Sequence, residues 1–514
     1  MDRYDAVWAK PTESYWIAST PACRYPALTA DLTVDVAIVG AGIAGITTAY
    51  LLRNEGLKVA LIEAETLAAG VSGHTTAKIS SQHRLIYSRM MRLMGRGLAQ
   101  QYAEANEAAI RLIKKHVAEH AIACDLSSQS AYVYTEKEEH RKEIEEEVKA
   151  AQSLGIEAHF CESLDLPLAV RGAVRFDGQA QFHPRSYLLS LAREFARCNG
   201  LVFERSRIVR FEQGKHHRLH TQDGGSVTAT TVVMATNCPV DGKAMFYSLR
   251  MYPSRSYIVA LRTKEAFPGG MYLRLEYPGR SLRAQPDGNE ELVLIGGENH
   301  KTGQGIDTRK HFCHLTNFAD ELFTVETIPY RWSTQDYKTV DGVPYVGFYS
   351  SRSEDKLVAT GFGKWGMTNG TAAGMILRDL IIAGQSPWQD VYHPSRKTIR
   401  ASARRFVAEG LNVTGTIIRE HITARPHSIQ LAPGHGGVFQ SDGKRIGAYR
   451  DEEGRMHLVN TTCTHMGCQL NWNAAEKSWD CPCHGGRFTY QGDVIQGPVV
   501  RPLKKIEAST LKQA

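Results

Sequence analysis

This sequence lacks several features that mark membrane and nucleic-acid-binding proteins. Its longest apolar stretches, Val36–Ala44 and Leu380–Ala383, are far shorter than the ~20 residues that a membrane span needs. The N-terminal residues MDRYDAVWAKPTESYW contain no apolar core of a secretory signal. No run of Lys and Arg is dense enough for a nucleic-acid stripe, since 61 basic residues balance 54 acidic ones. We therefore expect a soluble, cytoplasmic protein with no transmembrane segment and no nucleic-acid partner.

Internal repeats and low-complexity segments are also missing. The chain is 42% hydrophobic and 22% charged, which are ordinary values for a folded protein and exclude disorder, collagen and a coiled coil. Its 514 residues exceed what one hydrophobic core usually serves, so about 2–4 domains are expected.

The ten cysteines are unevenly distributed along the chain. Six are scattered singly, as is typical of buried small hydrophobic residues: Cys23, Cys124, Cys161, Cys198, Cys238 and Cys313. The other four, Cys463, Cys468, Cys481 and Cys483, crowd into one short stretch with histidines among them. Clustered Cys and His usually hold a metal, so the two halves of the chain are predicted to carry different chemistry.

A βαβ unit opens the first half. An apolar strand at Val34–Gly40 precedes a helix at Ala41–Gly56 and a second strand at Leu57–Glu65. The turn between the first strand and the helix reads G-x-G-x-x-G, with glycines at positions 40, 42 and 45. Such a turn brings backbone N–H groups and a helix N-terminus against a pyrophosphate. Glu63, about 20 residues on, is placed to accept hydrogen bonds from a ribose. The unit predicts dinucleotide binding.

The number of such units bears on which dinucleotide is bound. A flavoenzyme that also binds nicotinamide in a second Rossmann unit needs a second glycine fingerprint. None is present, because Gly296-Gly297 is not followed by a helix. One site at the N-terminus favours FAD over NAD.

The remaining segments fit a two-part chain. The sequence predicts a charged, solvated helix at Thr135–Ala151, alternating short strands from Phe203 to Tyr277, and a helix at Thr371–Ala383. Arg-rich helical sequence around Pro387–Pro426 resembles a connector, and short strands with Gly-rich turns from Ser428 onward predict a small all-β domain.

Several motifs between residues 15 and 385 resemble the FAD-dependent oxidoreductases of the D-amino-acid-oxidase and glycine/sarcosine-oxidase superfamily. They are the glycine turn with Glu63, the loop Gly70–Lys78, the Pro-initiated helix after Phe182, the segment Asp341–Gly347 and the segment Gly361–Thr368. In that family the last segment caps a helix whose positive end faces the pyrimidine side of the flavin. The resemblance implies these FAD-binding residues: Gly40, Gly42, Ile43, Ala44, Gly45, Glu63, Ala64, Ser72, His74, Thr75, Thr76, Ala77, Ile208, Ala235, Thr236, Gly361, Gly363, Lys364, Trp365, Gly366, Met367 and Thr368.

Two positions separate the chain from simple amino-acid oxidases. In those oxidases an Arg three residues before the Thr of a T-x-D-G motif clamps the substrate carboxylate. Here the motif begins at Thr339, and Asp336 occupies the Arg position. A carboxylate there would hold a cationic amine, or it would act as a capping or surface residue. His74 is the second position, because some relatives link FAD covalently through a His in this loop; we expect noncovalent FAD.

The C-terminal half contains C-x-H and C-x-x-H motifs, Cys463-Thr464-His465 and Cys481-Pro482-Cys483-His484. Two thiolates and two imidazoles suit zinc or a Rieske [2Fe–2S] centre. Cys₂His₂ zinc fingers keep the two cysteines together and the two histidines together, on a helix. Here each loop supplies one Cys and one His in Gly-rich β sequence, which favours the Rieske centre with Cys463, His465, Cys481 and His484 as ligands.

The longer strings resemble the Rieske proteins of respiratory and photosynthetic cytochrome complexes. That resemblance implies a disulfide between Cys468 and Cys483, and a shielding third loop at Gly497-Pro498 and Pro502. In the high-potential relatives a Ser and a Tyr follow the second His ligand by two and four residues. Here those positions are Gly486 and Phe488.

Together these features predict an α/β plus all-β protein. We expect a Rossmann-type FAD-binding domain with an interleaved antiparallel-sheet substrate domain (1–390), a helical linker (391–427) and a Rieske domain (428–514). The leading hypothesis is a dehydrogenase that oxidises a small amine or amino-acid-like substrate and passes electrons through the cluster to an unknown acceptor. Reverse flow from a carrier to the flavin, and a non-catalytic electron-transfer subunit, remain alternatives. A ring-hydroxylating oxygenase is disfavoured because no room follows the cluster for a catalytic domain.

Overall fold

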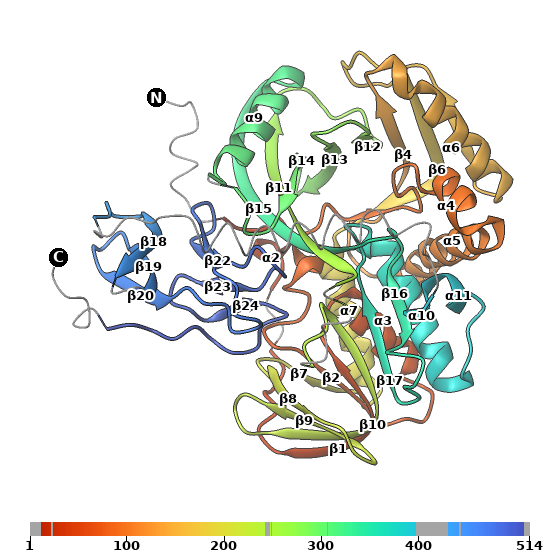
Figure 1. The fold of residues 1–514 in the computed structure, drawn as a ribbon. Coiled ribbons are helices and arrows are strands. Elements are labelled where there is room, and N and C mark those ends of the chain that lie inside the picture. Colours follow the sequence, from red (N-terminus) through yellow and green to blue (C-terminus); the bar gives the residue numbers. More distant parts are fainter. Residues whose placement is uncertain are drawn as a thin grey trace.

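The protein is described by a computed structural model (Figure 1) that covers residues 12–21, 24–241, 247, 249–305, 307–396, 430–441 and 444–507. Two large sheets and their helices form the described residues between 12 and 396, and two small sheets form the described residues from 430 to 507.

The first sheet is built on the predicted βαβ unit. Strand β1 (Asp31–Val39) lies parallel to β2 (Val59–Ile62) on one side and to β10 (Ser226–Asn237) on the other. In register, Val36 pairs with Val59 and with Thr231. The sheet has the order β16-β17-β10-β1-β2-β7, with β9 and then β8 joined to β10. Its other strands are β7 (Leu201–Phe203), β8 (Ile208–Glu212), β9 (His217–Thr221), β16 (Tyr345–Phe348) and β17 (Lys356–Thr360).

Two helices beside this sheet pack closely because glycines of one face larger side chains of the other. A Cβ at Gly370 of α10 (Gly366–Ala383) would lie 2.5 Å from the Ile43 side chain of α3 (Ile43–Leu52). A Cβ at Gly374 would lie 2.6 Å from Thr47. The glycines of α10 therefore let the two helices meet side by side. The other helices of this part are α2 (Tyr15–Ala18), η1 (Val71–Gly73), α4 (Ile86–Met94), α5 (Arg96–Glu119), α7 (Pro184–Arg197) and α11 (Gln389–Tyr392).

The second sheet is assembled from segments interleaved with the first, as predicted. Its order is β15-β11-β14-β13-β12-β4-β6-β3, with β5 beside β6. Most neighbours are antiparallel, and β12 with β4 is a parallel pair. Helix α9 (Lys310–Leu322) contacts β11, β14 and β15. The strands are β3 (Lys78–Ile79), β4 (Ser127–Thr135), β5 (Ala158–Cys161), β6 (Gly172–Gln181), β11 (Met251–Thr263), β12 (Met271–Arg274), β13 (Arg280–Asp287), β14 (Glu290–Lys301) and β15 (Val325–Thr339).

The charged helix predicted at Thr135–Ala151 was placed too early. Thr135 ends β4, a short turn η2 (Glu138–His140) follows, and α6 spans Arg141–Ser153. The prediction of a fully solvated charged face was also wrong in one place. Glu147 is 0% exposed, and its carboxylate accepts the N–H groups of Tyr87 and Ser88 at the start of α4. A buried acid is tolerated there because orphan N–H groups of a helix need acceptors.

The C-terminal part is all-β, as predicted. One sheet holds β18 (Gly436–Ser441), β19 (Lys444–Arg450) and β20 (Met456–Asn460). The other holds β21 (Asn471–Asn473), β22 (Ser478–Asp480), β23 (Arg487–Thr489) and β24 (Val494–Gln496), all antiparallel. In Figure 1 this part, in blue, lies beside β15 and between the two large sheets. The predicted helical linker falls mostly on residues outside the described ranges.

Candidate functional site

The glycine turn after β1 forms a backbone cradle. Gly40 has φ +102°, and a Cβ there would lie 2.6 Å from the Ala235 carbonyl oxygen. A Cβ at Gly45 would lie 1.9 Å from the Gly40 carbonyl oxygen, so Gly45 is needed for α3 to pack on the strand. Gly42 is the N-cap of α3 and offers no side chain to the first-turn N–H groups. These N–H groups and the positive helix end suit a pyrophosphate.

Glu63 ties this turn to the end of β2. Its carboxylate accepts the N–H of Ala41 at 2.7 Å and the N–H of Glu65 at 3.1 Å. Burial raises the pKa of Glu63, and the two N–H groups oppose that shift. The side chain lines the neighbouring cavity, where an acid can accept from ribose hydroxyls.

A cavity of about 720 Å³ extends from the glycine turn to the second sheet. Its volume lies within the range of ligand sites. Most predicted FAD-binding residues line it: Gly40, Gly42, Ile43, Ala44, Glu63, Ala64, Ser72, His74, Thr75, Thr76, Ile208, Ala235, Thr236, Gly363, Lys364, Trp365, Gly366 and Met367. Four do not: Gly45, Ala77, Gly361 and Thr368. Thr334, another lining residue, has a buried hydroxyl without a partner in the described part of the chain. The cradle, the elongated cavity and this orphaned hydroxyl fit FAD.

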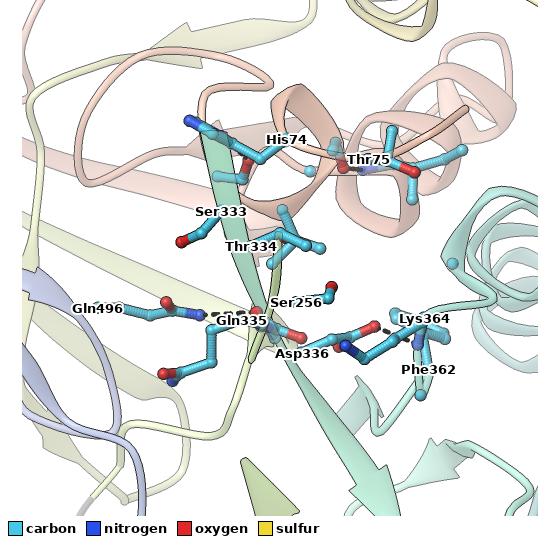
Figure 2. Close-up of a pocket in the computed structure, with 18 of the residues that line it drawn as sticks. His74, Thr75, Ser256, Ser333, Thr334, Gln335, Asp336, Phe362, Lys364 and Gln496 are labelled. Carbon is cyan, nitrogen blue, oxygen red and sulfur yellow. Dashed lines mark hydrogen bonds between the residues drawn. The ribbon is translucent and has the colours of Figure 1, made fainter. Parts of the chain in front are cut away.

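His74 lies at one side of the cavity (Figure 2). Its Nδ1 is 2.9 Å from the Gly70 carbonyl oxygen, so this nitrogen carries the proton and donates it. Its backbone oxygen accepts the indole N–H of Trp332 at 3.0 Å. Burial lowers the pKa of His74, which favours a neutral ring. That FAD is bound without a covalent bond to His74 stays a prediction.

Asp336 lines the cavity, but its carboxylate is already occupied. It accepts the N–H of Lys364 at 2.6 Å and that of Tyr337 at 2.8 Å. Burial raises the pKa of Asp336, and these two bonds oppose the shift. Figure 2 shows the side chain directed at the Lys364 backbone. This geometry is that of a residue that fixes the loop before α10, and the predicted binding of a cationic substrate stays untested.

Several polar lining residues were not predicted. They come from strands of the second sheet and from the segment after β3: Lys78, Gln82, Arg84, Tyr132 and Asn299. Lys78 Nζ donates to the Tyr272 carbonyl oxygen at 2.6 Å, and Lys364 Nζ donates to Asn299 Oδ1 at 2.6 Å. Burial lowers the pKa of both lysines well below the usual value. Lys78 is the last residue of the Gly70–Lys78 loop motif. Its place in that motif is the sequence signal that could have identified it as a lining residue.

The predicted cluster ligands lie on two loops of equivalent construction. The Cys463 N–H donates to the Cys468 carbonyl at 2.8 Å, and the Gly467 N–H donates back to Cys463 at 3.0 Å. In the second loop, Cys481 and Gly486 are joined at 2.8 Å, and the Gly485 N–H donates to Cys481 at 3.1 Å. Each loop also has a glycine with positive φ at its fifth position. The sequence folds each motif into the same short loop with its Cys at the start.

The side chains of these loops converge. The rings of His465 and His484 lie 5.2 Å apart, at 89° to each other. All four cysteines are buried, and the Sγ atoms of Cys468, Cys481 and Cys483 lie within 4.8 Å of one another. The Nδ1 of His484 is buried without a hydrogen-bond partner among the described residues. A buried imidazole nitrogen without a partner, on a residue that interacts with the buried Cys481 thiol, fits a [2Fe–2S] ligand set. Cys468 and Cys483 are free thiols here, so their disulfide stays a prediction.

The C-terminal part also forms one wall of the large cavity. The lining residues that it contributes are Glu476, Arg487, Thr489, Val494, Ile495, Gln496, Gly497, Val499 and Val500. Glu476 forms ion pairs with Arg487 of its own domain and with Arg255 of β11, and it hydrogen-bonds Ser333 of β15. Burial alone would raise the pKa of Glu476, but the two guanidinium groups outweigh it and lower that pKa to about 2. The charged Glu476 therefore fastens the two parts together.

A further property concerns membranes. Across the ranges that the structure covers, no helix combines the length and apolar character needed to cross a bilayer.

Comparison with known proteins gives the same two parts. The FAD dependent oxidoreductase family matches residues 35–380, and the Rieske [2Fe-2S] domain family matches residues 423–507. A Bacillus subtilis (strain 168) protein named as a Rieske 2Fe-2S iron-sulfur protein, YhfW, is 38% identical over 96% of this chain and 97% of its own length. The cytochrome b6-f complex iron-sulfur subunit of Chlorobaculum thiosulfatiphilum is 33% identical over 15% of this chain and 43% of its own.

Solved structures share the fold of the larger part. Glycine oxidase from Geobacillus kaustophilus aligns with a TM-score of 0.61 at 19% identity, over 71% of this chain and 99% of that one. L-proline dehydrogenase from P. horikoshii aligns with a TM-score of 0.60 at 16% identity, over 71% and 97%. The chain belongs to the FAD-dependent oxidoreductase family and carries a C-terminal Rieske domain, so it is an FAD-binding oxidoreductase with a [2Fe–2S] cluster.

Proposed function

We propose that this protein is a dehydrogenase that oxidises a small amine or amino-acid-like substrate and sends the electrons out through its Rieske cluster. The observation that carries this proposal is the shared wall: the Rieske domain lines the same cavity as the glycine turn. A flavin accepts two electrons as a hydride equivalent, and a Rieske centre moves one electron at a time. Placing both beside one cavity serves to convert one kind of transfer into the other.

The lining of the cavity supports an amino-acid-like substrate. Lys78, Lys364 and Arg84 bring basic groups to the cavity, and Tyr132 and Asn299 add hydrogen-bonding groups. Burial lowers the pKa of both lysines, and an anionic group bound beside them would favour their charged forms. Helix α10 begins at Gly366 on the same wall, and its positive N-terminal end favours negative charge beside it. These groups support a substrate that carries an anionic group.

The electron balance is simple. A substrate CH–NH group loses two electrons and two protons and becomes C=N. The two electrons leave singly to two molecules of a one-electron carrier protein, and water can then hydrolyse the imine. The first cluster loop offers a path by which electrons can leave the protein. Its residues Thr464, Met466 and Gly467 are exposed, and Met466 has an exposed fraction of 53%.

Anaerobic mixing with a panel of amines and amino acids tests the proposal. A substrate should bleach the flavin absorbance and then produce the electron paramagnetic resonance signal of the reduced cluster. In His484→Ala the flavin should bleach in the same way with no cluster signal. A substrate that bleaches the flavin of the intact protein while the cluster stays oxidised would contradict the proposal. Cluster reduction by a low-potential donor, followed by flavin reduction and no response to the panel, would instead establish reverse flow.

A further inference from the structure

Strand β15 uses its two faces differently near its C-terminal end. The side chains of Ser333, Gln335 and Tyr337 contact the Rieske domain. Ser333, Thr334, Gln335 and Asp336 all line the cavity, but Asp336, which alternates with the contacting residues, bonds the flavin-side loop at Lys364. Figure 2 shows the Gln496 side chain directed at the backbone carbonyl of Gln335, and the Asp336 side chain directed toward Lys364. The alternation follows from the period of two in a strand.

The second cluster loop is held by this strand through backbone carbonyls. Gln335 Nε2 donates to the Gly485 carbonyl at 2.7 Å, and its Oε1 accepts from Thr302 at 2.7 Å. The Oη of Tyr337 lies 2.9 Å from the carbonyl oxygens of both His484 and Gly497. Gln335 and Tyr337 are each 2% exposed. The bonds therefore involve buried side chains, where a lost partner leaves a buried polar group unsatisfied.

The contact is close enough to need glycine on both sides. Gly485 has φ +71°, and a Cβ there would lie 2.5 Å from Pro253 and 2.8 Å from Gln335 Nε2. A Cβ at Gly303 would lie 2.6 Å from the Pro482 nitrogen. The loop that carries His484 is thus pressed against the flavin-binding part.

The same strand also holds the loop on the flavin side. Asp336 accepts the N–H of Lys364 at 2.6 Å, and Lys364 precedes α10 on the cavity wall. Asp336 and Tyr337 are consecutive residues. Asp336 therefore bonds the loop on the flavin side, and the next residue, Tyr337, bonds the backbone carbonyl of the cluster ligand His484.

We propose that Gln335 and Tyr337 are positioning residues that set the distance between the flavin and the cluster, and so the rate at which electrons cross between them. The inference rests on the proposed exchange of electrons between the two groups, and it holds for either direction of flow. The rate of electron transfer falls steeply with distance, and it is higher across a hydrogen bond than across an empty gap. A loop fixed by buried hydrogen bonds keeps a constant separation, whereas a loosened loop would not.

The test uses the complete holoprotein and needs no substrate. Anaerobic flash photoreduction of the flavin by a deazaflavin supplies electrons, and bleaching of the cluster absorbance reports their arrival. We expect Tyr337→Phe to slow this step, and Tyr337→Phe combined with Gln335→Met to slow it by roughly tenfold or more. Hydrogen–deuterium exchange of the 481–486 amides should become faster in the same variants, while the cluster midpoint potential and content stay unchanged.

Tyr187→Phe is the matched control. It removes a buried hydroxyl in the flavin-binding part, bonded to His116 at 3.0 Å, from a residue that does not line the cavity. It should leave the rate and the loop exchange as they are. An unchanged transfer rate in the double variant overturns the proposal. A slower rate accompanied by lost cluster or a shifted potential also overturns it, because the residues would then act on the cluster itself. Failure of the amine panel would leave this result untouched.

Discussion

The backbone N–H of Lys364 donates to the Asp336 carboxylate over 2.6 Å, joining the loop before α10 to strand β15. Asp336 accepts a second N–H from Tyr337, so both acceptor oxygens are used within the protein. The Arg position of simple amino-acid oxidases is here taken by a residue that lines the cavity and holds the loop before α10 in place.

Asp336→Asn should therefore weaken FAD retention more than it changes the half-saturation for an amine. Asn keeps one acceptor oxygen but turns an NH₂ group toward one of the two N–H donors. Loss of a charge-assisted hydrogen bond costs about 1.5–3 kcal/mol, so the FAD dissociation constant should rise by roughly tenfold. Fluorescence of released flavin measures it.

Asp451→Asn serves as the control for Asp336→Asn. Asp451 is also buried and accepts a backbone N–H, from Arg455 at 2.7 Å, but it lies in the Rieske domain away from the cavity. The affinity of the Asp451→Asn variant for FAD should match that of the parent protein. If Asp336→Asn retained FAD normally and only raised the half-saturation for cationic amines, Asp336 would be a substrate-binding residue.

The two cofactor sites should be separable by single substitutions. His465→Ala or His484→Ala should abolish the Rieske signal and keep the FAD absorbance, because each removes one cluster ligand. Gly42→Val should remove the FAD absorbance and keep the Rieske signal. A Cβ at Gly42 already lies 3.3 Å from Ser72 Oγ, so a larger side chain would crowd the turn. His457→Ala in β20 is the control, because His457 pairs with Asp451 and not with the cluster loops. A full cluster signal in His484→Ala would refute the ligand assignment.

The charge on Glu476 should make the fastening of the Rieske domain pH-dependent. The folded-state pKa of about 2 lies below the usual value near 4.5, so its stabilisation is complete above pH 4.5 and is lost as the pH falls toward 2. For one carboxyl group the free energy of unfolding changes by at most about 1.4 kcal/mol per pH unit. Between pH 5 and pH 3.5, chemical denaturation should show a steeper loss of stability for the parent protein than for Glu476→Gln.

Asp451→Asn again provides a comparison, because Asp451 lies in the same domain and away from the shared cavity. Desolvation alone would raise the pKa of Asp451, but hydrogen bonds from His457 and Arg455 outweigh it and lower that pKa to about 2, so this variant loses the share of the slope that Asp451 contributes. It should keep the share that Glu476 contributes. Equal slopes for the parent protein and Glu476→Gln would show that Glu476 is not the group that titrates.

The sequence predicted the sites that are written in short motifs. The glycine turn and each Cys-His pair of the cluster loops depend on neighbours within a few residues, and Glu63 follows the turn at the spacing of a βαβ unit, 22 positions after the Ala41 N–H that it accepts. The Cys463 and Cys481 loops even share one pattern of backbone hydrogen bonds. Such features need no knowledge of distant contacts.

The contacts between the two parts could not be predicted in this way. Tyr337 and His484 are 147 positions apart, and Gln335 and Gly485 are 150 apart. Nothing in the local sequence of β15 distinguishes a residue that meets another domain from one that meets a core. The sequence singled out Asp336 as the residue in the Arg position. It could not show that the N–H groups of Lys364 and Tyr337 occupy the carboxylate, because that contact comes from the tertiary fold. Glu147 was assigned to solvent for the same reason, because its partners at Tyr87 and Ser88 are 60 and 59 residues away.

The last prediction concerns the potential of the cluster. Gly486 and Phe488 stand where high-potential relatives have a Ser and a Tyr that donate hydrogen bonds to a sulfide and a thiolate. Neither residue offers a side-chain donor, and such bonds are a principal means of raising the potential. The midpoint should therefore lie in the lower half of the window of roughly −150 to +300 mV for Rieske centres. Spectroelectrochemical titration of the holoprotein measures it.

The structure refines how the missing donors must be restored. A Cβ at Gly486 would lie 3.6 Å from Cys463 Sγ, which is suitable for a hydroxyl that reaches a sulfur, but only 2.8 Å from the Val499 side chain. Gly486→Ser should therefore be combined with Val499→Ala as well as with Phe488→Tyr, and Val499→Ala alone is the control. The triple variant should have a higher midpoint than this control. A parent midpoint near the top of the window, or no rise in the triple variant, would mean that other features set the potential, such as burial of the second loop against β15.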